Sequence, residues 1–194
     1  MSIVDSEEFL TLRAQLKEFY SNGHTGGDWD VFVISRFDED DETLRPYLST
    51  AYSDHFDPTL YTAVLQQRGK GGVWRGADDQ GGGHAEEKFI RSLNELVELF
   101  HRQPRLIEVY VSRIPCGKRS SPWQAHKPFE PVDMLWPEGC GPKLYLAMEA
   151  TPHIKWELLY EENYGNERSQ AESTVHIVRM NDLPNVRAGQ WLSS

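Results

Sequence analysis

The chain has 194 residues, with 20 Lys and Arg against 30 Asp and Glu, which gives a formal net charge of −10. Two cysteines in a chain of this length exclude a disulfide scaffold. No apolar run approaches the roughly 20 residues of a membrane span, and the acidic N-terminus does not resemble a secretory signal. We therefore expect a single globular domain over residues 1–194, cytoplasmic and without a membrane partner.

The negative charge is unevenly distributed along the chain. Residues 1–62 carry 4 Lys and Arg against 13 Asp and Glu, giving −9, and residues 128–194 carry 5 against 10, giving −5. Residues 63–127 carry 11 against 7, giving +4. A locally positive site on an acidic body suits an anionic substrate such as a nucleotide or nucleic acid. An ordinary helix with solvated charges explains the same counts.

The first 60 residues are predicted to hold one helix and one strand. The apolar face formed by Phe9, Leu12 and Leu16 predicts a helix over residues 6–20, and residues 31–34 are strand-like. The five acidic residues 38–42 are predicted to form a solvated loop, and residues 43–60 to be irregular. We treat residues 1–59 as an N-terminal helix with an acidic extension, ahead of a core over about 60–180.

A β-hairpin and a helix are predicted next. Residues 61–67 and 73–75 flank a Gly-rich turn, and residues 76–83 lead from this hairpin to His84. Apolar residues at helical spacing after His84, among them Phe89, Leu93 and Leu96, predict an amphipathic helix that begins near that histidine.

The remaining elements alternate strands and helices. Residues 106–111 are predicted to form a strand that ends in Ser112-Arg113-Ile114-Pro115-Cys116, and Cys140 precedes a helix with Pro142 in its first turn. Residues 154–160 and 174–180 are each predicted to form a strand. About nine polar residues between these two are too few for a crossover helix, so we expect an antiparallel pair, followed by a short tail.

The motif His84-Ala85-Glu86, the Pro115-Cys116 pair after a strand, and Cys140 before a helix resemble the zinc-dependent nucleobase deaminase superfamily. That superfamily includes free cytidine deaminases, tRNA adenosine deaminases, the polynucleotide cytosine deaminases of vertebrate immunity and bacterial toxin deaminases. The resemblance implies an α/β fold with a five-stranded mixed sheet between helices on both faces, a cytidine-deaminase-like three-layer arrangement. The predicted antiparallel final pair favours the branch that contains free cytidine deaminases and many toxin deaminases.

The resemblance implies a zinc site with His84, Cys116 and Cys140 as ligands. In the usual signature the second cysteine follows the first after two residues, but position 119 is Arg. We interpret Cys140 as the displaced second thiolate and residues 117–139 as an insertion between ligands. His126, within that insertion, is the alternative third ligand.

Glu86 is implied to move protons rather than to bind the metal. Residues two apart on a helix point to nearly opposite sides, so Glu86 is poorly placed to share the ion with His84. It would accept a proton from the attacking water, pass it to the ring nitrogen and later protonate the leaving ammonia.

Substrate contacts are predicted from small, basic and aromatic residues near the motifs: Ala85, Ser112, Arg113, Pro115, Trp74 and Trp123. Aromatic faces interleaved with cations stack bases and follow a phosphate chain. Packing of the tryptophans onto the sheet is the plainer reading, and we prefer it for Trp136 but not for Trp123.

Three functions remain open from the sequence. The first is hydrolytic deamination of cytosine in single-stranded nucleic acid, DNA before RNA, in a toxin domain delivered to the cytoplasm of a target cell or in another setting. The second is deamination of a free nucleoside or nucleotide, which the net charge of −10 favours. The third is a non-catalytic binding protein with a structural zinc or a Cys116–Cys140 disulfide. An oligomer is compatible with each of them.

Overall fold

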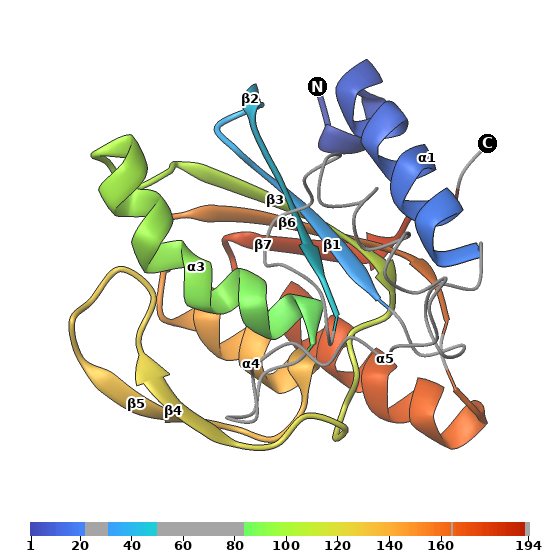
Figure 1. Ribbon diagram of the computed structural model, residues 1–194. Helices are drawn as coiled ribbons and strands as arrows, with labels where there is room; N and C mark the ends of the chain where they lie inside the picture. Colours follow the sequence, from blue (N-terminus) through green and yellow to red (C-terminus); the bar gives the residue numbers. More distant parts are fainter. Residues whose placement is uncertain (22–30, 50–83, 164, 193–194) are drawn as a thin grey trace, which may run out of the picture.

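The computed structural model describes residues 1–21, 31–49, 84–163 and 165–192 (Figure 1). The predicted hairpin at 61–75, with Trp74, lies outside these residues. Among the described residues, no helix is both long and apolar enough to cross a membrane.

A five-stranded mixed sheet forms the centre of the fold, in the order β2-β1-β3-β6-β7. The strands are β1 (Phe32–Phe37), β2 (Asp40–Leu48), β3 (Leu106–Arg113), β6 (Lys155–Glu162) and β7 (Val186–Gln190). β1 runs antiparallel to both of its neighbours, whereas β3, β6 and β7 are mutually parallel. The predicted class, an α/β fold with a five-stranded mixed sheet, is therefore confirmed.

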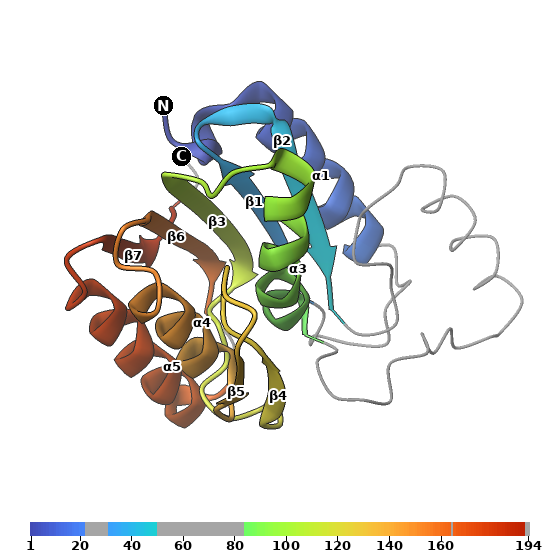
Figure 2. The same ribbon diagram turned by 90° about the vertical axis from the view of Figure 1, so that its left-hand side faces the viewer.

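Helices cover both faces of this sheet. The short 3-10 helix η1 (Ile3–Asp5) and α1 (Glu7–Ser21) pack on one face, and α3 (Ala85–Phe100), α4 (Cys140–Glu149) and α5 (Glu167–Asn181) pack on the other (Figures 1 and 2). The two faces are defined by strand periodicity. In β3, Ile107, Val109 and Val111 join the core under α3 and α4, while Tyr110 joins the core under α1. The predicted helices at 6–20 and after His84 are both confirmed.

β2 corrects the prediction that residues 43–60 are irregular from their start. Asp38 and Glu39 form the turn with positive φ angles of 56° and 58°, and β2 already begins at Asp40. Pro46 lies inside the strand, opposite Ile34. A proline is tolerated there because β2 is an edge strand and needs no backbone donor on its outer side. The sheet therefore begins well before residue 60.

The C-terminal third contains the largest error of the sequence interpretation. Residues 174–180 belong to α5 and not to a strand, and β7 pairs with β6 in parallel rather than antiparallel. Ser173, Ile177 and Met180 are buried at helical spacing, while Val175 and Val178 are exposed. The Asn166 side chain caps the helix by accepting a hydrogen bond from Ser169 N at 3.0 Å. The predicted antiparallel pair is therefore wrong, and it no longer supports the family branch that was chosen from it.

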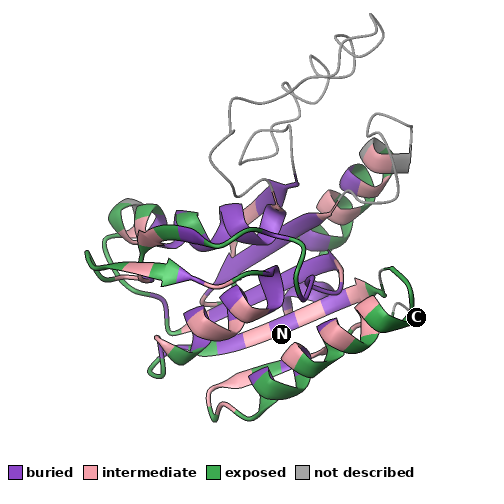
Figure 3. Cartoon of the chain, turned by 90° about the horizontal axis from the view of Figure 1, so that it is seen from below, coloured by how far each residue is buried: buried purple, intermediate pink, exposed green. Residues whose placement is uncertain are grey.

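The predicted insertion, residues 117–139, contains a small β-hairpin. β4 (Trp123–His126) and β5 (Asp133–Trp136) pair antiparallel, with Trp123 opposite Trp136. In this hairpin, residues 130–133 are exposed, whereas Trp123 and Trp136 near its base are buried. Figure 3 shows how buried and exposed residues are distributed over the chain.

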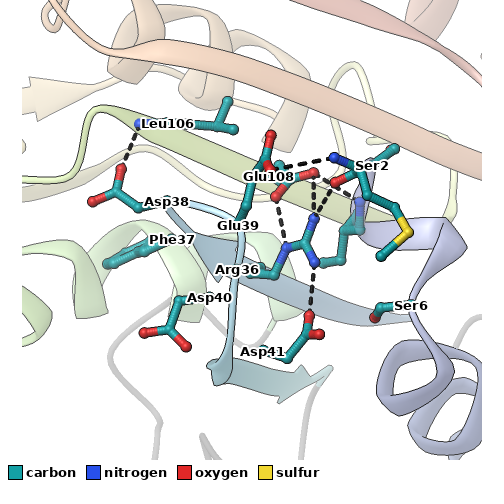
Figure 4. A network of polar contacts seen from close by, with 12 residues as sticks. Ser2, Ser6, Arg36, Phe37, Asp38, Glu39, Asp40, Asp41, Leu106 and Glu108 are labelled. Carbon is teal, nitrogen blue, oxygen red and sulfur yellow. Dashed lines mark hydrogen bonds and ion pairs between the residues drawn. The ribbon is translucent and has the colours of Figure 1, made fainter.

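A buried network of charges lies on the α1 face (Figure 4). Arg36 and Glu108 sit opposite each other in the β1–β3 register, and Arg36 Nε donates to Glu108 Oε2 at 2.7 Å. Arg36 also donates to Asp41 Oδ1 and to the Met1 carbonyl oxygen, each at 2.7 Å. Glu108 Oε1 accepts from Ile3 N at 2.7 Å. This network ties the N-terminal segment to the sheet.

Candidate metal centre

His84 is positioned by the start of α3. It is the N-cap residue of that helix, in extended conformation with φ −81° and ψ 143°. The Glu87 carboxylate accepts a hydrogen bond from His84 N at 3.3 Å, as the third helical residue does in a capping box. This places His84 next to the first turn of α3, near the C-terminal end of β3.

The two ends of the 117–139 insertion come together, and this brings the cysteines next to each other. Gly139 N donates to Ser120 O at 2.8 Å, and Gly141 N donates to Cys116 O at 2.9 Å. Gly139 has a φ of 86°, and a Cβ there would lie 2.0 Å from the Gly117 carbonyl oxygen. The chain thus returns to Cys116 as α4 begins, so 23 intervening residues do not separate the two thiols in space.

The donor atoms of His84, Cys116 and Cys140 all lie within 4.8 Å of one another. His84 Nδ1 is 3.3 Å from Cys140 Sγ and 3.8 Å from Cys116 Sγ. A tetrahedral zinc ion with Zn–S of about 2.3 Å and Zn–N of about 2.0 Å holds its ligand atoms roughly 3.6–3.8 Å apart. Both cysteines are free thiols. One imidazole nitrogen and two sulfurs at this spacing fit zinc, so the displaced-cysteine hypothesis has the geometry that it requires.

The two thiols have pKa values shifted in opposite directions. Hydrogen bonding from Cys140 lowers the pKa of Cys116 against the opposing effect of burial, and His84 lowers it further. Cys140 N also donates to Cys116 Sγ at 3.4 Å. Burial, followed by the neighbouring Cys116 thiolate, raises the pKa of Cys140. Cys116 is therefore the thiolate of the pair, and a divalent cation would deprotonate the second thiol as it binds.

Glu86 lies beside the cluster with an unsatisfied carboxylate. The residue is 2% exposed, and its Oε2 has no hydrogen-bond partner among the residues that the structure describes. Burial, reinforced by the charge of Cys116, raises the pKa of Glu86 to about 7. A carboxyl group with a pKa near neutrality can both accept and release a proton at physiological pH. Its oxygen atoms are not part of the three-residue cluster, in agreement with a role other than ligation.

His126, the alternative ligand, lies away from the cluster. Its imidazole is 57% exposed in β4, and Nδ1 lies 2.7 Å from Asp133 Oδ1 across the hairpin. The structure therefore does not support His126 as a third ligand.

Trp123 does not present the free stacking face that the sequence suggested. Its side chain is 6% exposed and packs edge-on against Trp136, with ring centroids 6.1 Å apart. Arg91 and Lys143 lie over the Trp123 ring at 4.1 and 5.0 Å from its centroid. A buried tryptophan with these neighbours anchors the insertion to α3 and α4.

The other predicted substrate residues lie close to the ligands in the chain but differ in what they contact. Ala85 is fully buried at the first position of α3, and Pro115 is buried beside Cys116. Ser112 Oγ accepts a hydrogen bond from Phe32 N at 3.0 Å, so its hydroxyl serves the sheet. Arg113 is partly exposed, 3.9 Å from Glu162. Their contacts with a substrate stay a prediction.

Two residues of the site were missed from the sequence. Glu87 and Lys143 form a buried ion pair, with Lys143 Nζ 2.7 Å from Glu87 Oε1. A glutamate three residues after a helix N-cap is a recognisable signal for Glu87. Lys143 has no such signal, because a lysine in the first turn of an amphipathic helix is ordinarily solvated.

No protein-family model matches the sequence, and no curated protein matches it. Among solved structures, the crystal structure of Aspergillus oryzae Rib2 deaminase in complex with DARIPP, a C-terminal deletion mutant at pH 6.5, aligns with a TM-score of 0.39 and 10% identity. The alignment covers 92% of this chain and 84% of that chain. A likeness of this size does not establish a common fold, so function is argued below from the donor set and Glu86.

Proposed function

We propose that the protein is a zinc-dependent hydrolytic deaminase that converts cytosine to uracil in single-stranded nucleic acid, DNA rather than RNA. The observation that carries the proposal is a set of three donors within 4.8 Å beside a buried carboxylate oxygen without a partner among the described residues. A structural zinc site is closed by four protein ligands, whereas a catalytic site uses three and leaves one position open. The described part of the chain supplies three such ligands, and Glu86 beside them favours catalysis over a structural metal.

Glu86 would transfer two protons during the reaction. Zinc held by three protein ligands supplies Lewis-acid activation of a water molecule near neutral pH. Glu86 accepts one proton from the water as the water oxygen bonds to C4 of cytosine, and delivers that proton to N3. It then moves the second proton from the same oxygen to the exocyclic nitrogen. The C4–N bond breaks, ammonia leaves and C4 becomes a carbonyl carbon of uracil.

Basic side chains next to Cys116 favour a polymeric substrate. Arg113 precedes it, while Lys118 and Arg119 follow it, and the Lys118 side chain is 66% exposed. Cations that flank a catalytic pocket can follow the phosphates of a single strand while the base enters the pocket. Deamination also requires a base outside a duplex stack, which a single strand supplies at low cost.

A free nucleotide is the second candidate, and specific observations favour it. Trp123 is buried rather than available for stacking. Arg113 and Lys118 have acidic neighbours, with Glu162 at 3.9 Å and Glu172 at 3.7 Å, which reduces the local positive potential. The net charge of −10 opposes a phosphate chain more strongly than one phosphate group.

A product assay on the zinc-loaded protein separates these candidates. The panel consists of DNA and RNA oligonucleotides with one cytosine, free cytidine, deoxycytidine and their monophosphates, with Glu86→Ala as the inactive reference. We expect uracil in the DNA oligonucleotide and none with Glu86→Ala. Turnover confined to the free compounds would contradict the polymer substrate but keep the deaminase. A zinc-loaded protein without product on any cytosine compound would contradict the deaminase itself.

A further inference from the structure

Lys143 is a charged residue buried completely inside the protein. It belongs to α4, one turn after Cys140, and its side chain has an exposed fraction of 0%, while that of Glu87 is 1%. Its ammonium group donates to Glu87 Oε1 at 2.7 Å, Ser120 Oγ at 2.6 Å and Ser121 O at 2.8 Å. An ammonium group has three donors, so all of them are used.

The three acceptors come from segments that each adjoin one ligand of the candidate metal centre. Glu87 belongs to the first turn of α3, and its other carboxylate oxygen accepts from His84 N at 3.3 Å. Ser120 and Ser121 lie at the base of the insertion that follows Cys116, and Ser120 O accepts from Gly139 N at 2.8 Å. Lys143 itself is on the helix that begins with Cys140. One ammonium group therefore connects the segments of His84, Cys116 and Cys140.

Because Lys143 is buried, breaking any of its three hydrogen bonds would be energetically costly. A buried charge without its partners is costly, by several kcal/mol per ion after relaxation, so any movement of α3, α4 or the insertion base that lengthens one of the three hydrogen bonds is opposed. In families with two cysteines close in sequence, one short turn holds both thiolates in place. Here 23 residues separate them, and a fixed contact in space must replace that turn.

We propose that Lys143 is the positioning residue of the metal centre, holding the His84, Cys116 and Cys140 segments at the separation that the ion requires. This inference rests on the proposed function, because it presupposes that the three donors bind zinc. Partners outside the ligand set commonly orient metal ligands, and their loss typically weakens metal affinity 10- to 100-fold. The hydrogen bonds of Lys143 go to Glu87, Ser120 and Ser121, so it would act through α3 and the insertion base.

The experiment compares Lys143→Met with Arg36→Met. Arg36 is the matched control, since its pair with Glu108 is as deeply buried, with exposed fractions of 2% and 1%, but lies on the opposite face of the sheet. Zinc affinity of each folded variant is measured by competition with a chelating dye, and cobalt(II) absorption reports the geometry of the thiolate ligands. We expect Lys143→Met to bind zinc about 10- to 100-fold more weakly with an altered cobalt spectrum. Arg36→Met should lose stability but keep affinity within about threefold.

Two milder variants keep the proposal testable if Lys143→Met does not fold. Glu87→Gln retains the shape but removes the charge, and Ser120→Ala removes one of three acceptors. Weaker zinc binding by either, relative to Arg36→Met, supports the proposal, and wild-type affinity in both overturns it. A folded Lys143→Met with wild-type affinity and spectrum also overturns it while leaving the metal centre intact. A wild-type protein that binds no zinc contradicts this proposal and the proposed function together.

Discussion

Glu108 and Glu86 are two carboxylates of similar burial, with exposed fractions of 1% and 2%. They lie in two regions of the protein and differ in whether their oxygen atoms have hydrogen-bond partners. On the α1 face, Glu108 accepts from Arg36 Nε, Arg36 Nη2 and Ile3 N, so both of its oxygens are satisfied (Figure 4). Beside the candidate metal centre, Glu86 Oε2 has no partner among the described residues.

We interpret the difference as one between a carboxylate that stabilises the fold, Glu108, and one proposed to take part in catalysis, Glu86. A buried carboxylate without partners costs stability, so it persists where another requirement opposes its removal. Buried polar groups are expected to have hydrogen-bond partners throughout the fold, and exceptions are expected at functional sites. Glu87 is adjacent in sequence to Glu86 but resembles Glu108, because it is paired with Lys143. Substitutions near the candidate metal centre and on the α1 face should therefore have different effects.

The largest expected effect is on turnover in Glu86→Ala. General acid–base groups contribute about 10²–10⁴-fold, and Glu86 serves several proton transfers, so we expect a loss at or beyond 10⁴-fold. Zinc content should stay at the wild-type level, and stability should be equal or higher because an unpaired buried carboxylate is removed. Glu95→Ala, an exposed change on the same helix, is the control and should keep wild-type turnover. Loss of zinc along with turnover would show that Glu86 is a ligand.

Glu108→Gln is the matching change on the other face, and it should affect stability instead. Removing one partner of a buried ion pair costs about 3–5 kcal/mol because the other charge is left uncompensated. Denaturant unfolding measures the loss, and zinc per folded chain should not change. A stability within about 1 kcal/mol of wild type would mean that the network does not hold the N-terminal segment.

Gly139→Ala tests how the insertion closes. The substitution combines a φ of 86° with a Cβ placed 2.0 Å from the Gly117 carbonyl oxygen, so it should cost more than about 1 kcal/mol and weaken zinc binding. Gly189→Ala is the control, since a Cβ there meets nothing within 4 Å. Comparable unfolding curves for the two variants would contradict the closed base of the insertion.

The smallest expected effect concerns acid stability on the α1 face. Burial opposes ionisation of Glu161, but hydrogen bonds from Arg13 and Lys17 outweigh it and lower the pKa of Glu161 to about 2. A lowered folded-state pKa gives stability that is present above the unfolded value near 4.5 and lost as the pH falls toward 2. Melting temperatures between pH 6 and pH 3 should therefore fall more steeply for wild type than for Glu161→Gln. Parallel profiles would contradict this linkage.

The three residues of the candidate metal centre could be picked out from the sequence because each lies at a helix or strand boundary that local residues mark. His84 precedes an amphipathic helix, Cys116 follows a β-branched strand, and Cys140 precedes Pro142 in a first helical turn. Such boundaries are local in sequence, so they can be read without knowing which segments meet. The mixed sheet with flanking helices was implied by the family resemblance that these residues carry.

The parts that could not be predicted depend on tertiary contacts. The run Thr174 to Met180 has the β-branched composition of a strand, and only burial of Ile177 and Met180 against the sheet selects the helix. Pro46 and the acidic run argued against β2, but pairing with β1 at an edge overrides both. The burial of Lys143 arises from three segments far apart in sequence, which no local pattern records.

In the proposed metal centre, Cys140 is the third ligand beside His84 and Cys116. Zinc per chain is to be measured on purified Cys140→Ala and Cys116→Ala beside wild type. We predict one zinc in wild type, comparably reduced zinc in the two variants, and a lower melting temperature in both, because metal bound by the folded state adds to stability. Retention of one zinc per chain in Cys140→Ala would contradict the displaced-cysteine site.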